Sequence, residues 1–457
     1  MSRDREAVVW TRLGGSPIRV GRLYLTESDC RFSYDPDYLH TGLPGLGLVY
    51  APEVFREHTI VRKRTAFFDF LPPIQSLIPP QSERNFQRRL ILAYLAKSGH
   101  VPARGIDEDW EILKVAGHGA IGHLDIFDSD EKARAWYGAS AETALVELTA
   151  DLGLSLKAFL AWFDQEAELW LHVIGPTPSI GGAIPKLLVS IPESGWDGRI
   201  GLPTRPGAHG VTDVVLKFEQ SATYPGIIEL EALALEVHRA AGFEVPRYWM
   251  THINGVPALA VERFDRDRVH APVFTESLYS ILASGDASVS NNYSYSYDKI
   301  GRALDRSPVR LVTDPDKAKR HLLHRLVLAL LTGNGDLHLE NLSIIDRGEG
   351  PCFSPVYDPT PMRAYPIHNM LAVMPFGAYG ELPAKRTDPV GFVEALLNFA
   401  RNLGVGRGAL RDIITASLAC TRSYDQRVAA LGSLPENNKH KLITIARNMA
   451  STLEAVL

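Results

Sequence analysis

The stretch GDLHLENL at residues 335–342 follows an apolar helical run and decides what fold and chemistry this chain is expected to have. It places a carboxylate, Asp336, five positions before a carboxamide, Asn341. That is the spacing of a phosphotransferase catalytic loop, in which a carboxylate orients or deprotonates the acceptor hydroxyl and further oxygen ligands hold magnesium. We therefore assign Asp336 to the acceptor and Asn341 to the metal.

A second metal carboxylate is expected shortly after this loop on a neighbouring strand. The stretch FSPVYD at residues 353–358 supplies Asp358, seventeen residues beyond Asn341. The three polar residues predict a kinase with ATP and Mg²⁺ as cofactors. Because Asp-x-x-x-x-Asn is common, the prediction also requires a phosphate-covering loop, a strand lysine and an adenine-holding connector.

The candidate phosphate loop is PSIGGAIPK at residues 178–186. Gly181 and Gly182 lack Cβ atoms, so their backbone amides can approach phosphate oxygens, and Lys186 adds a positive charge. The spacing fits neither the Walker nor the dinucleotide-binding pattern. The same glycines also suit a hairpin turn leading into a strand at 187–191, and kinase glycine-rich loops are themselves hairpins.

The candidate strand lysine is Lys217, inside the apolar run VVLKF at 214–218. A lone strand lysine more often extends to the surface. However, the helix-forming segment 228–237 follows and carries Glu231 fourteen residues downstream, which is the kinase order of an ion-paired lysine and glutamate. Glu229 and Glu236 are alternatives for the glutamate.

The candidate connector is ALAVERFDR at residues 258–266, an apolar strand that turns abruptly into charge. Its backbone would face adenine, with Glu262 and Phe264 bordering the base. An edge strand meeting solvent is the alternative interpretation.

Taken in order, these motifs resemble the HipA-like serine/threonine kinases, the toxins of bacterial type II toxin-antitoxin pairs. The resemblance lies in SIGGAIPK (179–186), VERFDR (261–266), GNGDLHLENLS (333–343) and SPVYD (354–358), and in FFDFLP (67–72) and GHGAIG (117–122) near the amino terminus. It implies an α+β fold with a protein-kinase-like two-lobed core, an amino-terminal α/β region and a mostly helical C-terminal lobe.

The resemblance also implies roles for individual residues. Asp336 and His338 would be catalytic, and Asn341 and Asp358 would bind metal. The nucleotide would be bound by Ser179, Gly181, Gly182, Lys186, Lys217, Glu231, Glu262 and Phe264. Ser179 matches the loop serine that family members autophosphorylate, and a phosphate there would add close to two negative charges beside the nucleotide.

Expected partners follow from the family as well. The first is a helix-turn-helix antitoxin of the HipB type, through which the chain would contact DNA indirectly. The second is a protein substrate that takes part in translation, and substrates in this family include aminoacyl-tRNA synthetases. Growth arrest would result. The catalytic loop equally resembles that of aminoglycoside and choline kinases, so a small-molecule phosphotransferase is an alternative. A pseudokinase corepressor that acts through a DNA-binding partner is another.

Composition agrees with a globular protein of several packed units. At 457 residues the chain is too long for one simple core, and we expect regions at 1–150 (amino-terminal α/β), 151–270 (nucleotide-binding lobe) and 271–457 (helical catalytic lobe). No apolar stretch approaches the roughly 20 residues that cross a bilayer, so a cytoplasmic protein without membrane contact is expected. With 53 acidic and 48 basic residues, the chain has no global field for DNA.

Several local elements are also predicted. Strands at 7–10 and 20–25 are joined by a turn, and residues 284–297, rich in Ser, Asn and Tyr, form a surface loop. Asp388 and Pro389 are expected to cap and open a helix that ends at Gly404. Its buried stripe consists of Phe392, Leu396, Phe399 and Leu403. A last helix spans about 435–453.

Overall fold

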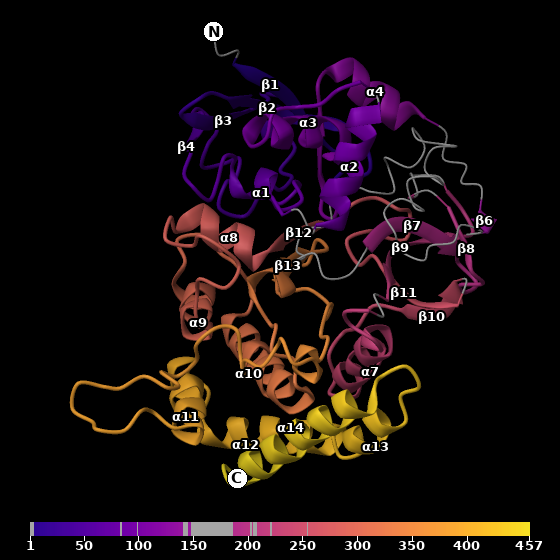
Figure 1. Ribbon diagram of the computed structural model, residues 1–457. Coiled ribbons are helices and arrows are strands. Elements are labelled where there is room, and N and C mark those ends of the chain that lie inside the picture. Colours follow the sequence, from indigo (N-terminus) through magenta and orange to yellow (C-terminus); the bar gives the residue numbers. More distant parts are fainter. Residues whose placement is uncertain are drawn as a thin grey trace. The chain divides into compact units, whose positions relative to one another are not determined.

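The computed structural model describes residues 4–82, 85–97, 99–139, 145–147, 186–201, 203, 208–219, 222–253 and 255–457. The chain forms two compact units (Figure 1). The first contains residues 1–220, 247–290 and 345–347, and the second contains 221–246, 291–344 and 348–457. The predicted division at residues 150 and 270 stays a prediction.

The first unit begins with a five-stranded sheet in the order β4-β3-β2-β1-β5, whose neighbouring strands are all antiparallel. Its strands are β1 (Arg5–Thr11), β2 (Ile18–Leu25), β3 (Asp29–Tyr34), β4 (Ile60–Lys63) and β5 (Leu124–Phe127). The 3-10 helix η1 (Tyr38–His40) follows β3, and four helices accompany the sheet: α1 (Pro72–Gln75), α2 (Phe86–Lys97), α3 (Ile106–Ala116) and α4 (Asp130–Gly138).

Helices cover both faces of this sheet. Successive residues of a strand point to opposite sides, so buried residues at successive positions of β1 require a packing partner on each side. Val9 belongs to the large core that includes residues of α1, α2 and α3, whereas Val8 packs with Phe127 and Ala133 of α4. The predicted strand-turn-strand at the start of the chain is confirmed by β1 and β2.

A second, four-stranded antiparallel sheet in the first unit has the order β10-β11-β9-β7. Its strands are β7 (Lys186–Pro192), β9 (Val211–Phe218), β10 (Tyr248–Ile253) and β11 (Val256–Glu262). The unit also contains the short pair β6 (Val146–Glu147) and β8 (Arg199–Ile200), then β12 (Phe274–Ser277) and α8 (Leu278–Gly285). The core of the first sheet continues beneath this one through Leu187, Val214 and Ala260. The strands predicted at 187–191, 214–218 and 258–262 are confirmed.

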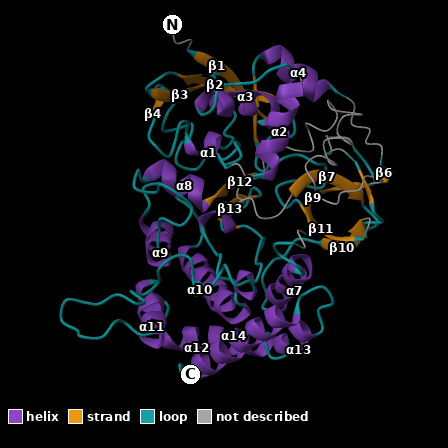
Figure 2. Cartoon of the chain, in the orientation of Figure 1, coloured by secondary structure: helices purple, strands orange, loops and turns teal. Residues whose placement is uncertain are grey.

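The second unit is mostly helical (Figure 2). Its helices are α7 (Ile227–Ala240), α9 (Tyr297–Arg306), α10 (Pro315–Thr332), α11 (Phe392–Asn402), α12 (Arg407–Cys420), α13 (Tyr424–Ala429) and α14 (Glu436–Glu454), with 3-10 turns η2 (Leu339–Asn341) and η3 (Met362–Ala364). The chain passes into the first unit within β13 (Ser343–Asp346) and returns before β14 (Cys352–Phe353).

Helix α10 is the centre of this unit and packs against α9, α12 and α14. It starts where the Asp314 side chain accepts a hydrogen bond from the Lys317 amide at 2.9 Å, and Pro315 occupies the first turn. Leu322, Leu326 and Leu330 are buried on it. Such burial fixes the direction in which the following loop leaves the helix.

One helix start was predicted wrongly. Asp388 and Pro389 do not cap α11, which begins at Phe392 after Gly391 as N-cap. Burial of Leu396, Phe399 and Leu403 decides the position of the helix, and the Asp-Pro pair lies in the exposed segment before it. The final helix is confirmed, since α14 follows Pro435. The loop predicted at 284–297 is confirmed for residues 286–296, whereas Ser284 and Gly285 end α8 and the buried Tyr297 begins α9, so the predicted bounds were wrong at both ends.

Candidate functional site

The predicted catalytic loop follows α10, and the end of that helix fixes where the loop begins. Gly333 ends the helix in the left-handed conformation, with φ 75°. The buried Tyr424 hydroxyl donates to the Thr332 carbonyl oxygen at 2.9 Å and so satisfies a carbonyl that a helix end leaves open. The Asn334 side chain accepts from the Asp336 amide at 2.9 Å. The loop therefore leaves α10 in a defined conformation.

Asp336 and Asn341 are joined through the backbone of the loop. The Asn341 Nδ2 donates to the Asp336 carbonyl oxygen at 2.8 Å, and the Asn341 amide donates to the His338 carbonyl oxygen at 3.0 Å. The carboxamide nitrogen is thus used to close the loop, and Oδ1 is the atom that suits a hard cation. The Asp336 side chain is 31% exposed, so an acceptor from solvent can reach it.

His338 lies next to Asp336 and is buried. Its Nδ1 accepts from the Glu340 amide at 3.2 Å, so in a neutral ring the proton is carried by Nε2. Nε2 lies 3.9 Å from Asp336 Oδ2, which is too far for a hydrogen bond. This arrangement suits a residue that supports the carboxylate, and the catalytic role predicted for His338 stays a prediction.

Asp358 has an unusual backbone, with φ 49° at a residue other than glycine. Such a conformation costs on the order of 1 kcal/mol or more and persists only where neighbouring contacts impose it. The preceding Tyr357 is held in place, because its hydroxyl contacts Ser343 Oγ at 2.6 Å and the Glu340 carbonyl oxygen at 2.5 Å. Tyr357 thereby ties the segment that carries Asp358 to the end of the catalytic loop. The strand predicted for Asp358 was wrong, because β14 ends at Phe353 and residues 354–361 lie outside any helix or strand.

The donor set fits magnesium held mainly by a nucleotide. The described residues contain no group of three or more His, Cys, Asp and Glu side chains that would bind a metal by themselves. Magnesium commonly keeps several waters and binds one or two protein carboxylates together with substrate phosphates. Asp358 and the Asn341 carboxamide oxygen match that requirement in type, and the metal roles predicted for them and the acceptor role predicted for Asp336 stay predictions.

In the first unit, Lys186 and Lys217 are directly opposite each other. They are cross-strand partners on β7 and β9, and they are only 5% and 4% exposed. Directly opposed residues of an antiparallel pair lie on the same face of the sheet, and like charges there destabilise each other. The nucleotide-binding roles predicted for Lys186 and Lys217 stay predictions.

The connector after β11 is held in place by hydrogen bonds of the Arg263 side chain. The Arg263 guanidinium contacts Asp265 Oδ2 at 2.7 Å and the Ala120 carbonyl oxygen at 2.6 Å. Glu262 instead forms a two-pronged ion pair with Arg247 at 2.7 and 2.9 Å, and Phe264 is half-buried. The adenine contacts predicted for Glu262 and Phe264 stay predictions.

Asp265 is the centre of a buried charge cluster. It also contacts Arg266 Nη1 at 2.8 Å and accepts from the Gly122 amide at 2.9 Å. Burial by itself would raise the pKa of Asp265, but the charges of Arg263 and Arg266 outweigh it and lower the pKa to about 2. The glycine-rich segment at 117–122, quoted above for its family resemblance, is thus bound to the connector.

The remaining predicted residues divide into two groups. Ser179, Gly181 and Gly182 lie outside the described residues. Glu231 lies on α7 in the second unit and is 1% exposed. Its alternatives are used elsewhere, since Glu229 accepts from the Ser433 amide at 3.0 Å and Glu236 pairs with Arg427. The predicted ion pair with Lys217 stays a prediction.

Tyr357 and Tyr293 were missed as single residues by sequence reasoning. Tyr357 belongs to the motif SPVYD at 354–358, and Tyr293 belongs to the polar loop at 284–297. The local pattern that could have indicated Tyr357 is a tyrosine directly before the carboxylate predicted to bind metal, Asp358. The contact of Tyr293 with Asp336 depends on tertiary structure, so no local pattern reveals it.

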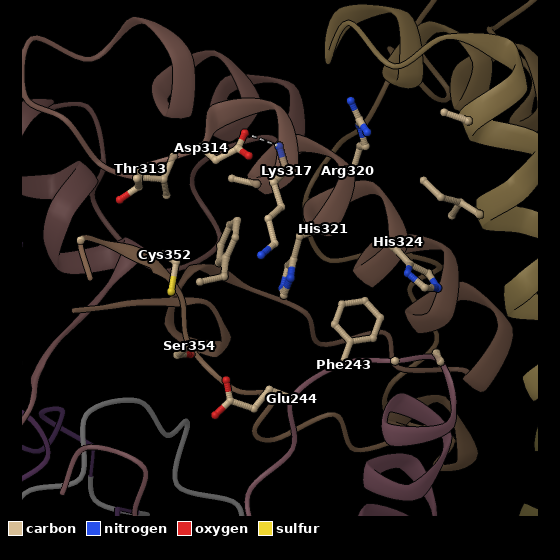
Figure 3. Close-up of a pocket in the computed structure, with 18 of the residues that line it drawn as sticks. Phe243, Glu244, Thr313, Asp314, Lys317, Arg320, His321, His324, Cys352 and Ser354 are labelled. Atoms are coloured by element: carbon tan, nitrogen blue, oxygen red, sulfur yellow. Dashed lines mark hydrogen bonds between the residues drawn. The ribbon is translucent and has the colours of Figure 1, made fainter. Parts of the chain in front are cut away.

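A separate cavity of about 830 Å³ lies in the second unit between the start of α10, β14, α12 and the turn after α7 (Figure 3). The His321 ring stacks on Phe353 at 4.6 Å and meets Phe243 edge-on at 4.9 Å. The ring centroid of His324 lies 4.6 Å from the ring centroid of Phe243. Asp336, Asn341 and Asp358 do not line this cavity.

Comparisons with known proteins agree with the fold and the loop. The model of the HipA-like C-terminal domain matches residues 178–423. A Haemophilus influenzae protein named "Putative kinase" is 26% identical over 278 residues, which cover 56% of this chain and 76% of that protein. "Putative kinase Y4mE" of Sinorhizobium fredii is 29% identical over 240 residues, 51% of this chain and 53% of that one.

A solved structure extends the likeness to nearly the whole chain. It is the Shewanella oneidensis MR-1 toxin-antitoxin complex of HipA, HipB and operator DNA, with a TM-score of 0.63 and 18% identity over 98% of this chain and 97% of that chain. The predicted α+β, kinase-like two-lobed fold is confirmed. Fold and loop define a protein of the kinase-like class. The chain belongs to the HipA-like family, as the matched domain shows. Among the described residues no helix is long and apolar enough to cross a bilayer.

Proposed function

We propose that the chain is an ATP- and magnesium-dependent protein kinase that phosphorylates serine or threonine. The observation that carries the proposal is the closed loop in which the Asn341 side chain holds the Asp336 carbonyl at 2.8 Å. This contact holds the loop that carries a partly exposed carboxylate and a carboxamide five positions apart, and it supports a role for both residues in phosphoryl transfer. Membership of the HipA-like family supports it.

Each remaining residue has a proposed task. Lys217 and Lys186 neutralise nucleotide phosphates, since two buried cations oppose each other on that sheet. Glu231 pairs with Lys217, and Glu262 and Phe264 border adenine. Magnesium, bound by Asn341 and Asp358, would neutralise charge on the phosphates.

Asp336 acts on the acceptor. Its carboxylate accepts a hydrogen bond from the serine or threonine hydroxyl and aims that oxygen at the γ-phosphorus. A new bond forms between this oxygen and the phosphorus while the bond to the β–γ bridging oxygen breaks. ADP leaves with the bridging oxygen, and the hydroxyl proton passes to Asp336. His338, whose Nε2 lies 3.9 Å from Asp336 Oδ2, is the second proposed catalytic residue.

Ser179 is the proposed site of autophosphorylation. Its phosphate would carry close to two negative charges and would repel the phosphates of bound nucleotide, which displaces the loop. Mass spectrometry after incubation with ATP tests this point. Unmodified Ser179 in active protein, with phosphate on other residues, would show that the assignment is wrong.

The proposed partner is a helix-turn-helix antitoxin, through which the chain would reach DNA. The similar Shewanella oneidensis protein is found in a complex with HipB and operator DNA, and this supports the proposal. The proposed substrate is a protein of translation, so that phosphorylation arrests growth.

A phosphate-transfer assay with wild type and Asp336→Asn tests the function. Radiolabelled ATP is offered with cell-lysate proteins in one arm and with aminoglycosides or choline in the other. Label on protein that is absent with Asp336→Asn is the expected result. Label on the small molecules would favour the phosphotransferase alternative, and absence of ATP binding would favour a pseudokinase.

A further inference from the structure

Residues 291–294 form a tight turn held by its own side chains. The Tyr293 amide donates to Asn291 Oδ1 at 2.9 Å. The Ser294 hydroxyl donates to the Asn291 carbonyl oxygen at 2.8 Å and accepts from the Asn291 amide at 3.0 Å. An Asn and a Ser that satisfy neighbouring backbone groups in this way give a polar loop one defined shape.

This turn is attached to the catalytic loop on two sides. The Leu339 amide donates to the Asn292 carbonyl oxygen at 3.1 Å. At the end of the polar loop, the fully buried Tyr297 donates its hydroxyl to the Leu337 carbonyl oxygen at 2.6 Å. The bonded residues Leu337 and Leu339 lie on either side of His338, so the turn is fixed beside the proposed catalytic carboxylate.

Tyr293 projects from the turn onto this carboxylate. Its ring meets His338 edge-on, with ring centroids 5.1 Å apart and planes at 89°. Its hydroxyl donates to Asp336 Oδ1 at 3.4 Å. A hydroxyl that donates to Asp336 makes the same contact that a serine or threonine acceptor has to make before transfer.

We propose that Tyr293 is an acceptor-site gate, whose hydroxyl occupies the place of the substrate hydroxyl at Asp336 and is displaced when an acceptor binds. The inference rests on the proposed kinase function. It adds that Tyr293 controls the entry of the acceptor to the same site. It gives the polar loop 284–297 a role.

The contact is suited to reversible opening. At 3.4 Å it is a long hydrogen bond, and the Tyr293 side chain is 42% exposed. Rotation of the side chain into solvent breaks this long bond together with the side-chain contact with Asn292 and the ring contact with His338, while the backbone bond at Asn292 and the bond of Tyr297 keep the turn in place. Burial and the neighbouring Asp336 charge both raise the pKa of the Tyr293 phenol, so it remains a donor near neutral pH.

The variants Tyr293→Phe and Tyr293→Ala separate the gate from a positioning role. ADP release is measured with water as the acceptor, phosphate transfer is measured with casein as the probe, and ATP affinity is measured separately. A gate predicts faster ADP release for Tyr293→Phe, by at most about fivefold, because fivefold is the factor of one ordinary hydrogen bond and this one is long. Tyr293→Ala also removes the ring and should raise kcat/KM for casein at unchanged ATP affinity.

Tyr295→Ala is the matched control. Tyr295 lies in the same polar loop but packs against Lys299, whose Nζ is 5.3 Å from the ring centroid, so this variant should retain wild-type rates. Slower or unchanged turnover in both Tyr293 variants would overturn the gate, because a positioning tyrosine is needed for transfer. Wild type that binds no ATP and turns over none would instead overturn the proposed function, and the gate with it.

Discussion

The Asn341 carboxamide nitrogen donates to the Asp336 carbonyl oxygen over 2.8 Å. One side chain therefore closes the catalytic loop and, in the proposed function, offers its oxygen to magnesium. Asn341→Asp keeps an oxygen and loses the donor, whereas Asn341→Ala loses both. We expect each variant to lose about 1 kcal/mol of unfolding free energy, the value of one hydrogen bond.

The two Asn341 variants should differ in their need for magnesium. Asn341→Ala should raise the Mg²⁺ concentration for half-maximal transfer several-fold, and Asn341→Asp should raise it less, since a carboxylate oxygen is a good ligand for Mg²⁺. A magnesium titration of phosphate transfer measures both. An equal shift in the two variants would exclude the oxygen as a ligand.

Asp336→Asn should remove phosphate transfer without unfolding the protein. The Asp336 backbone contacts, which hold the loop, are unaffected by the change. A positioned general base contributes roughly 10²–10⁴-fold, so transfer should fall by about that factor while the midpoint of thermal unfolding stays near that of wild type. Asp388→Asn, in an exposed segment, is the control and should retain full activity.

Tyr357→Phe should destabilise the link between the loop and the segment that carries Asp358. The change leaves the buried Ser343 hydroxyl and the Glu340 carbonyl oxygen without their shared partner. Loss of such bonds in a buried place costs about 1–3 kcal/mol. Urea unfolding of Tyr357→Phe, Ser343→Ala and the double variant measures the coupling. Strictly additive effects would show that the two hydroxyls do not act together.

Asp265→Asn should be among the more destabilising conservative changes in the first unit. It leaves Arg263 and Arg266 buried without their anion, and breaking a buried pair in this way costs about 3–5 kcal/mol. Urea unfolding followed by tryptophan fluorescence measures the loss. Asp197→Asn breaks an exposed pair with Arg199 and should change little. A similar small effect for Asp265→Asn would contradict the inferred role.

The second unit should lose stability in mildly acidic solution. Burial, with the charge of Arg325 as a further cause, lowers the pKa of His238 to about 3 and of His324 to about 4, and lowers that of His321 in the same direction. The unfolded chain binds protons near pH 6.5, whereas the folded histidines do not, so stability is complete above about pH 6.5 and falls toward pH 4.

His321→Phe should reduce this dependence on pH. The phenyl ring keeps the stack on Phe353 and removes a buried Nε2 that has no hydrogen-bond partner among the described residues. Unfolding free energies at pH 7 and pH 5 measure the slope. An unchanged slope would show that His321 is not one of the groups responsible.

The helix end before residues 335–342 and the strand around Lys217 could be predicted from the sequence because their signals are local. Asp336, Asn341 and the strand around Lys217 lie within short patterns whose geometry follows from helix ends and strand periodicity. The α11 start was wrong because burial of Phe399 and its neighbours outweighed a good capping pair. The Tyr293–Asp336 contact spans 43 residues, and the Arg263–Ala120 contact spans 143, so neither leaves a pattern in one sequence.

The path of the chain between the two units has a practical consequence for anyone who wishes to separate them. The chain passes from one unit to the other five times, after residues 220, 246, 290, 344 and 347. Neither unit is therefore a continuous piece of polypeptide. A fragment that starts at residue 221 would contain Asp336 and the complete second unit, but it would also carry residues 247–290 and 345–347 of the first unit, so truncation at the two ends cannot isolate the helical unit alone.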